Sequence, residues 1–248
     1  VFTLMRAGWT GVFAGIAVAW GIAAEVVHAA ELRWGADPEG GAPFIFADPK
    51  QPEVLIGYEV DLMRALAEET GRKEVFVQAQ WESLIPGLQR RDYDLAVNGL
   101  EITEDRKREV LFSDPYYVGF LQLTVRAEEE RVRSLADLTG QKVGTLKGTL
   151  AQTVLEKAPG IQPVTYESQV TTYDDLVLGR TRAVLLDFPI ALYFGSPNRK
   201  LKNIGEPVER MLYGIGMRKS DSALAGEINQ ALVRLWKSGK MREIYERW

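Results

Sequence analysis

From residue 31 onward, short apolar runs alternate with helical patterns, and this alternation constrains the fold more than any other feature. It is typical of α/β proteins, in which helices cover a largely parallel sheet. One series of strands and helices runs to about residue 99, and a second begins near Ser134. The final helices follow a late strand, so we expect two α/β lobes joined by more than one crossing.

Hydrophobic periodicity and the residues that start or stop helices predict the individual elements. The expected strands cover residues 32–36, 74–78, 93–98, 121–126, 142–146, 183–187 and 211–217. The expected helices cover residues 61–70, 83–91, 150–157, 173–178, 189–194, 222–238 and 241–248, with shorter ones after Thr103 and Ser134.

The first thirty residues differ from the rest of the chain. A basic start at Met5-Arg6 precedes an apolar run over residues 11–24 and an A-x-A-like site that ends at Ala29. This order predicts a secretory signal peptide over residues 1–29. The alternative is a membrane anchor, but the apolar run is short for a span of roughly 20 residues.

The sequence has no cysteine and one histidine, His28, which lies inside the predicted signal peptide. The mature chain would then have no thiol or imidazole for nucleophilic catalysis or metal ligation. A net charge of −4 argues against nucleic-acid binding, which depends on clustered Lys and Arg. Residues 144–149 lack the ending of a phosphate-binding loop. We therefore expect no cofactor and no metal, while acid–base chemistry by carboxylates is left open.

Open α/β sheets bind ligands beyond the carboxyl ends of their strands, so residues at these places are candidates for a site. Each has an ordinary structural role when taken alone, such as a helix cap or a core aromatic. The candidates are Asp37, Trp81, Asn98, Gly99, Thr149 and Asp187.

Arg106 is a further candidate, because it lies in the first turn of a helix that Thr103 would cap. An arginine at this position opposes the helix dipole, so a purely solvated role is slightly unfavourable. Directed into a cleft, its guanidinium would hold a carboxylate in bidentate fashion. The helix that starts at Thr149 would offer free N–H groups to the same charge.

Seven motifs connect these candidates to a known family. They are GYEVDL at 57–62, WESLIPGL at 81–88, ITEDR at 102–106, FSDPYY at 112–117, VGTLKGT at 143–149, AVLLD at 183–187 and GKMREIY at 239–245. Each motif is weak by itself. In this order and spacing, the sequence resembles the periplasmic solute-binding proteins for polar amino acids, the family 3 receptors of ABC importers.

The resemblance implies a type II periplasmic-binding fold, in which two α/β lobes with two hinge crossings close on the ligand. Lobe 1 would comprise residues 30–119 and 214–248, and lobe 2 residues 120–213, with hinges near 120–122 and 213–215. The protein would be a monomer in the periplasm that delivers an amino acid to an ABC transporter permease.

The resemblance also implies roles for the candidates. Arg106 would bind the ligand α-carboxylate and Asp187 the α-ammonium group. Trp81 would pack on the ligand side chain, and Asp37 would sense its distal group. The polar shell would be completed by the backbone of Asn98 and Gly99 and by the helix start at Thr149.

Three places depart from the family pattern. Glu101 stands where Ser or Thr is usual, Leu150 stands where Thr or Gly is frequent, and residues 38–42 lack an aromatic that commonly covers the ligand. If Asp37, Glu101 and Asp187 are all ionised beside Arg106, the site is negative, which favours an amino acid with a cationic side chain. Alternatively, Glu101 pairs with Arg106 or is protonated by burial, which leaves a neutral ligand such as glutamine.

Two other functions are left open. An enzyme of the same fold, similar to cyclohexadienyl dehydratase, would need a general acid in the cleft, and Glu101 is the one unusual candidate. A ligand-sensing domain fused to a permease or receptor would have its membrane part beyond Trp248.

Overall fold

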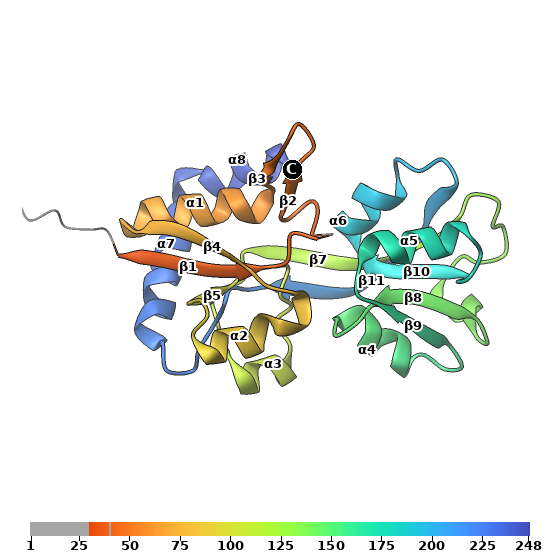
Figure 1. The fold of residues 1–248 in the computed structure, drawn as a ribbon. Helices are drawn as coiled ribbons and strands as arrows, with labels where there is room; N and C mark the ends of the chain where they lie inside the picture. The colour runs from red at the N-terminus through yellow and green to blue at the C-terminus, as the bar shows by residue number, and fades with distance from the viewer. Residues whose placement is uncertain (1–29, 40) are drawn as a thin grey trace, which may run out of the picture.

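The computed structural model describes residues 30–39 and 41–248, so the predicted signal peptide at 1–29 lies outside the described residues. Figure 1 shows two lobes side by side with long strands running between them. Each lobe is built around its own five-stranded sheet. The two-lobed α/β architecture predicted from the alternation of strands and helices is therefore confirmed.

The sheet of the first lobe has the strand order β4-β1-β5-β12-β6. Its parallel strands are β4 (Lys73–Gln78), β1 (Glu31–Ala36) and β5 (Leu95–Ala96), and β12 (Gly216–Met217) runs antiparallel to β5 and to β6 (Leu111–Phe112). One face is covered by α1 (Tyr58–Thr70), α7 (Ser222–Ser238) and α8 (Lys240–Arg247). On the other side lie η1 (Trp81–Ser83), α2 (Leu84–Arg90) and α3 (Glu104–Glu109) (Figure 1).

The sheet of the second lobe has the order β11-β7-β10-β8-β9. Its strands are β7 (Tyr117–Arg126), β8 (Lys142–Leu146), β9 (Gln162–Tyr166), β10 (Ala183–Asp187) and β11 (Leu201–Tyr213). The helical segments of this lobe are η2 (Leu135–Leu138), α4 (Leu150–Lys157), α5 (Gln169–Val177), α6 (Phe188–Ile190) and the π-helical turn η3 (Ala191–Gly195).

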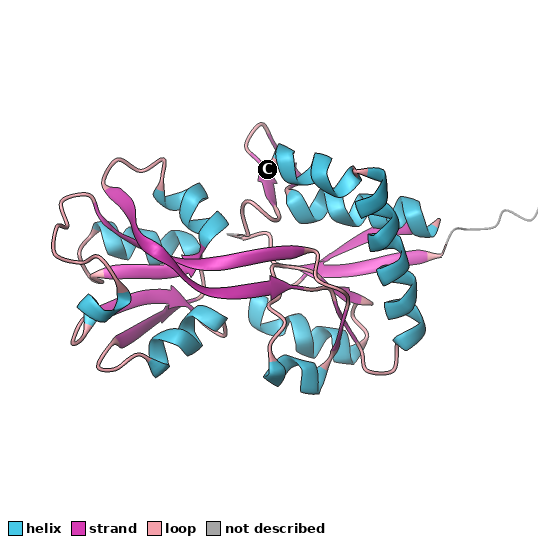
Figure 2. Ribbon diagram, turned by 180° about the vertical axis from the view of Figure 1, so that it is seen from behind, coloured by secondary structure: helices cyan, strands magenta, loops and turns pink. Residues whose placement is uncertain are grey.

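Strands β7 and β11 connect the lobes, as the long paired ribbons in Figure 2 show. They pair antiparallel from Tyr117 opposite Tyr213 to Arg126 opposite Leu201. The hinge predicted at 120–122 lies inside β7, and the one predicted at 213–215 lies between β11 and β12. The exact limits of the lobes stay a prediction, because β7 continues without interruption through the proposed boundary.

Two predicted strands are shorter in the structure. The strand expected at 93–98 has only Leu95–Ala96 paired, because the chain then turns and Gly99 adopts a left-handed φ of 61°. The strand expected at 211–217 is divided between β11 and β12, and the Gly214 N–H donates to the Leu100 carbonyl instead of to a sheet partner. Both breaks turn the backbone at the ends of strands next to the space between the lobes.

Several strand regions were not predicted from the sequence, among them β6, residues 201–210 of β11 and the two regions described next. One is the hairpin of β2 (Phe46–Asp48) and β3 (Gln51–Ile56), and the other is β9. Pro52 and Pro163 lie near the starts of β3 and β9, and proline argues against a central strand. β9 lies at the edge of its sheet, where proline is tolerated because one side of the strand needs no ladder hydrogen bonds.

Buried aliphatic and aromatic side chains fill both lobes. In the first lobe Trp34, Leu62 and Leu66 pack between α1 and the sheet, and in the second Val143 and Leu185 lie in the sheet interior. Within residues 30–39 and 41–248, no helix combines the length and the apolar character that crossing a bilayer requires.

Candidate functional site

A cavity of about 380 Å³ lies between the lobes, with walls from both. Seven of the nine predicted site residues line it: Asp37, Trp81, Asn98, Gly99, Glu101, Thr149 and Asp187. Arg106 and Leu150 do not line it, but both bind Glu101, which does. The structure therefore brings together residues that are up to 150 positions apart in the sequence.

Asp37 holds the wall of the first lobe together. Its Oδ2 accepts the Trp81 N–H at 3.2 Å, and its own N–H donates to Asn98 Oδ1 at 2.9 Å. These bonds join the ends of β1 and β5 to the start of η1. The pKa of Asp37 is raised, because partial burial outweighs the hydrogen bonds that its carboxylate accepts.

Glu59 lies beneath this wall and was not predicted as a site residue. It is fully buried in the first turn of α1, where Oε1 accepts the Gly99 N–H at 2.6 Å and the Tyr116 hydroxyl. Burial raises the pKa of Glu59 to about 7, against the opposing effect of these bonds. Since the Gly99 N–H is committed to Glu59, the group that Gly99 can offer to a ligand is its carbonyl oxygen.

Glu101 and Arg106 form an ion pair in which Glu101 is 2% exposed and Arg106 is 14% exposed at the side chain. Arg106 Nη1 also donates to the Glu101 carbonyl at 3.0 Å, and Nη2 donates to the Gly148 carbonyl at 2.9 Å. The other Glu101 oxygen, Oε1, accepts the Leu150 N–H at 3.0 Å. In this structure the guanidinium holds the carboxylate of Glu101, and its role toward a ligand carboxylate stays a prediction.

Thr149 begins α4 as predicted. Its Oγ1 accepts the Gln152 N–H at 3.3 Å and donates to the Leu146 carbonyl at 2.8 Å, so the hydroxyl is occupied as a cap. Leu150 contributes its backbone N–H and not its side chain. The start of α4 thus meets a carboxylate, as the helix dipole favours.

Trp81 lies over the guanidinium of Arg106, with 5.4 Å between Arg106 Cζ and the ring centroid. A cation over an indole face is stabilised by the ring quadrupole. Trp81 is half-buried on the cavity wall and also packs against the buried cluster that contains Leu84 and Leu88.

Asp187 ends β10 on the opposite wall. It is buried, and its Oδ2 accepts the hydroxyl of Tyr213 on β11. The pKa of Asp187 is raised, first by burial and then by the negative charge of Glu101. Tyr213 was considered only as part of a hinge, and nothing in its local pattern indicates that its hydroxyl reaches the cavity wall.

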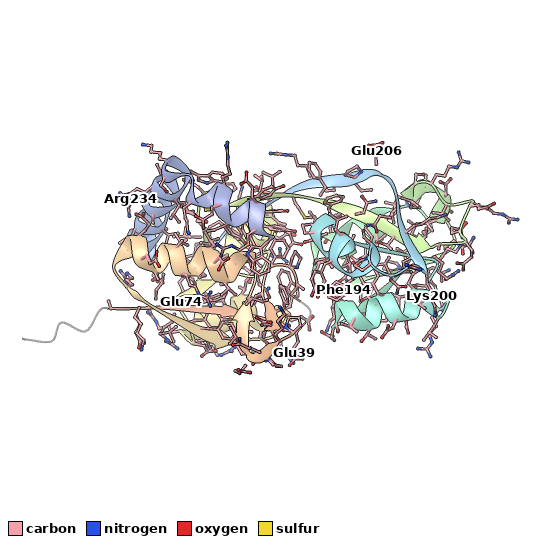
Figure 3. The ribbon with its side chains drawn as sticks, turned by 90° about the horizontal axis from the view of Figure 1, so that it is seen from above. Glu39, Glu74, Phe194, Lys200, Glu206 and Arg234 are labelled. Carbon is pink, nitrogen blue, oxygen red and sulfur yellow. The ribbon has the colours of Figure 1, made fainter. Side chains whose placement is uncertain are left out.

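Further charged residues on the cavity wall were missed. Glu39, Glu82 and Glu167 line the cavity together with Lys147, whose Nζ lies 3.0 Å from Glu82 Oε2 and 3.3 Å from Glu167 Oε1. Figure 3 places Glu39 at the edge of the first lobe that faces the second. Six carboxylates and one ammonium group therefore line the cavity.

An aromatic side chain lines this cavity from the segment that follows β1, although residues 38–42 contain none. It is Phe44, two residues further along, which lines the cavity and is 3% exposed. Its ring packs edge to face on Tyr58, Tyr117 and Tyr213, with centroids 6.3, 5.6 and 5.4 Å away. Phe44 was not among the predicted site residues, because only the path of the loop brings it to the cavity wall.

The arrangement suits reversible binding of a small cation. No group of three or more His, Cys, Asp or Glu side chains with the placement of a metal site occurs within the described residues. The carboxylates instead lie on both walls of an enclosed space, where an ammonium or guanidinium group gains charge-assisted hydrogen bonds.

Comparison with known proteins gives concordant matches. The sequence profile of the bacterial extracellular solute-binding proteins, family 3, matches residues 32–248. The ABC transporter glutamine-binding protein GlnH of Bacillus subtilis is 32% identical over 210 residues, which cover 83% of this chain and 76% of GlnH.

Two solved structures extend the likeness. An ancestral arginine-binding protein bound to glutamine has a TM-score of 0.82 at 34% identity, covering 88% of this chain and 97% of its own. The ancestral amino acid-binding protein AncCDT-1, a precursor of cyclohexadienyl dehydratase, has a TM-score of 0.81 at 30% identity, covering 88% and 95%.

Proposed function

The chain belongs to the bacterial extracellular solute-binding proteins, family 3, and we propose that it captures an amino acid with a cationic side chain. Closure of the two lobes encloses the ligand. The loaded protein, a monomer in the periplasm, then delivers the ligand to the membrane permease of an ABC importer.

The excess of carboxylates on the cavity wall supports a cationic ligand. Glu101 is paired with Arg106, and Lys147 is paired with Glu82 and Glu167. Within the described part of the chain, Asp37, Glu39 and Asp187 have no ion-pair partner. Asp37 and Glu39 therefore keep the wall negative after the pairing of Glu101, and Asp187, whose pKa burial raises, adds its charge when a cation binds beside it.

Calorimetric titration against the twenty amino acids tests this proposal. We expect heat from arginine, lysine or histidine, and Asp37→Asn should weaken that binding about tenfold by removing one wall charge. Asp174→Asn is the matched control, because Asp174 is exposed on α5 and outside the cavity. Heat from glutamine or another neutral amino acid, with none from the three cationic ones, would contradict the proposal.

A dehydratase activity is the second candidate, favoured by the likeness to a precursor of cyclohexadienyl dehydratase. The candidate acid Glu101 has one oxygen on Arg106 and the other on the Leu150 N–H. Both oxygens are therefore engaged by donors of the protein, which leaves neither placed to donate a proton to a substrate. We therefore propose a binding protein without turnover, and product formation from prephenate or arogenate at a useful rate would contradict this.

A further inference from the structure

Glu101 occupies a position that is built to receive a carboxylate. Arg106 approaches from the first lobe, and the first N–H group of α4 approaches from the second. A guanidinium and a helix N-terminus are both groups that bind carboxylates in proteins. The carboxylate between them belongs to the protein itself and lies on the cavity wall.

Glu101 engages two donors that approach it from opposite lobes, Arg106 Nη1 and the Leu150 N–H. Arg106 Nη1 serves both the side chain and the backbone of Glu101, and Nη2 serves the Gly148 carbonyl. The N–H of Gln152, which also lies in the first turn of α4, donates to Thr149 Oγ1. A ligand carboxylate that sought these donors would first have to displace Glu101.

Displacement of Glu101 would be unfavourable. The side chain is 2% exposed, so moving it from Arg106 leaves a carboxylate buried without its cation, which is strongly destabilising. A displaced Glu101 side chain would also lie among the other carboxylates of the wall. One of them is Asp187, whose pKa is already raised in part by the negative charge of Glu101.

We infer that the side chain of Glu101 fills the position in the cleft where a ligand carboxylate would otherwise bind. The carboxylate of a cationic ligand then contributes little to the affinity of that ligand. The class of ligand is then the organic amine cation, with or without an α-carboxylate. This inference rests on the proposed cationic ligand and makes Glu101 the residue that determines specificity toward the ligand's other end.

Paired probes test the inference: arginine against agmatine, its decarboxylated amine, and lysine against cadaverine. In the wild-type protein we expect the dissociation constants within each pair to agree within tenfold. In Glu101→Ser, the freed N–H groups should donate to the ligand carboxylate, and the preference for the amino acid over its amine should increase at least tenfold.

The matched control is Glu104→Ser, which alters a carboxylate 82% exposed on α3. We expect it to leave both members of each pair unchanged. If Glu101→Ser does not fold, Glu101→Gln preserves the volume and should shift the preference in the same direction. A wild-type preference for the amino acid above tenfold, or a preference that the substitution leaves unchanged, would overturn the inference.

A measurement without ligand separates this inference from the proposed function. Glu101 belongs to the first lobe and Leu150 to the second, so their hydrogen bond joins the lobes. We expect the Leu150 amide to exchange at least tenfold faster in Glu101→Ser than in the wild-type protein or Glu104→Ser. Equal exchange would overturn the inference, whereas absence of binding by all four probes would contradict only the cationic ligand.

Discussion

The hydroxyl of Tyr213 donates a hydrogen bond to Oδ2 of Asp187, and this bond connects the strand that joins the lobes to the wall of the ligand cavity. Both residues are buried. Asp187 has a raised pKa because burial disfavours its charge, and the bond from Tyr213 opposes that effect. The charge that would hold a ligand ammonium group is therefore set partly by a residue of β11.

The raised pKa of Asp187 predicts that ligand binding releases protons. A bound ammonium group favours the ionised carboxylate, so the pKa of Asp187 falls on binding, and affinity rises with pH until the carboxyl of the free protein is ionised. The rise should approach tenfold per pH unit at its steepest. Calorimetry at several pH values, in buffers with different ionisation enthalpies, measures the protons released, and a constant affinity from pH 6 to 8.5 would contradict this.

Replacement of Tyr213 by phenylalanine should shift that pH dependence. The lost hydrogen bond raises the pKa of Asp187 further, so Tyr213→Phe should bind about threefold to tenfold more weakly at pH 7 and recover at higher pH. Tyr245→Phe is the control, because Tyr245 is 60% exposed. An equal loss of affinity at every pH would indicate distorted packing and not the loss of this bond.

Glu59 should make stability depend on pH. Its pKa is about 7 in the folded protein and about 4.5 when exposed, so the stability it contributes is greatest below pH 4.5 and is lost as pH rises to about 7. That loss amounts to about 3 kcal/mol. Denaturant unfolding across this range should show a smaller decrease in Glu59→Gln than in the wild-type protein. Glu68→Gln, exposed on the same helix, should behave as the wild type, and identical slopes in all three would exclude this role for Glu59.

Trp81 should contribute to affinity through its ring. Removing a half-buried indole from the cavity wall and from Arg106 should weaken ligand binding about tenfold to a hundredfold in Trp81→Ala, and less in Trp81→Phe, which retains an aromatic face. Titration calorimetry measures both variants against Trp236→Ala, whose side chain is exposed on α7. Similar affinity in Trp81→Ala and the wild type would show that the ring does not contact the ligand.

The sequence could predict which residues lie at the ends of strands, but not which side chains contact them. Asp37 and Asn98 follow neighbouring strands of one sheet, whose carboxyl ends meet at one edge, so their proximity followed from local pattern. Asp187 ends a strand of the other sheet, and only the packing of the two lobes brings it to the same cavity. The loop position of Phe44 and the hydroxyl of Tyr213 carried no such signal, because their places depend on the path of the chain between elements.

The alternation of apolar runs and helices determined by itself that this chain forms two α/β lobes, because the periodicity of each segment fixes its element and the face it buries. The order and spacing of the seven motifs indicated the family. Only the tertiary structure decided that the carboxylate of Glu101 lies between Arg106 and the start of α4. Sequence places Glu101 five residues before Arg106 and almost fifty before Leu150, and no local rule chooses between an ion pair, a protonated acid and a free charge. Burial at the junction of the lobes makes that choice, because a carboxylate removed from water must take the nearest cation and N–H group.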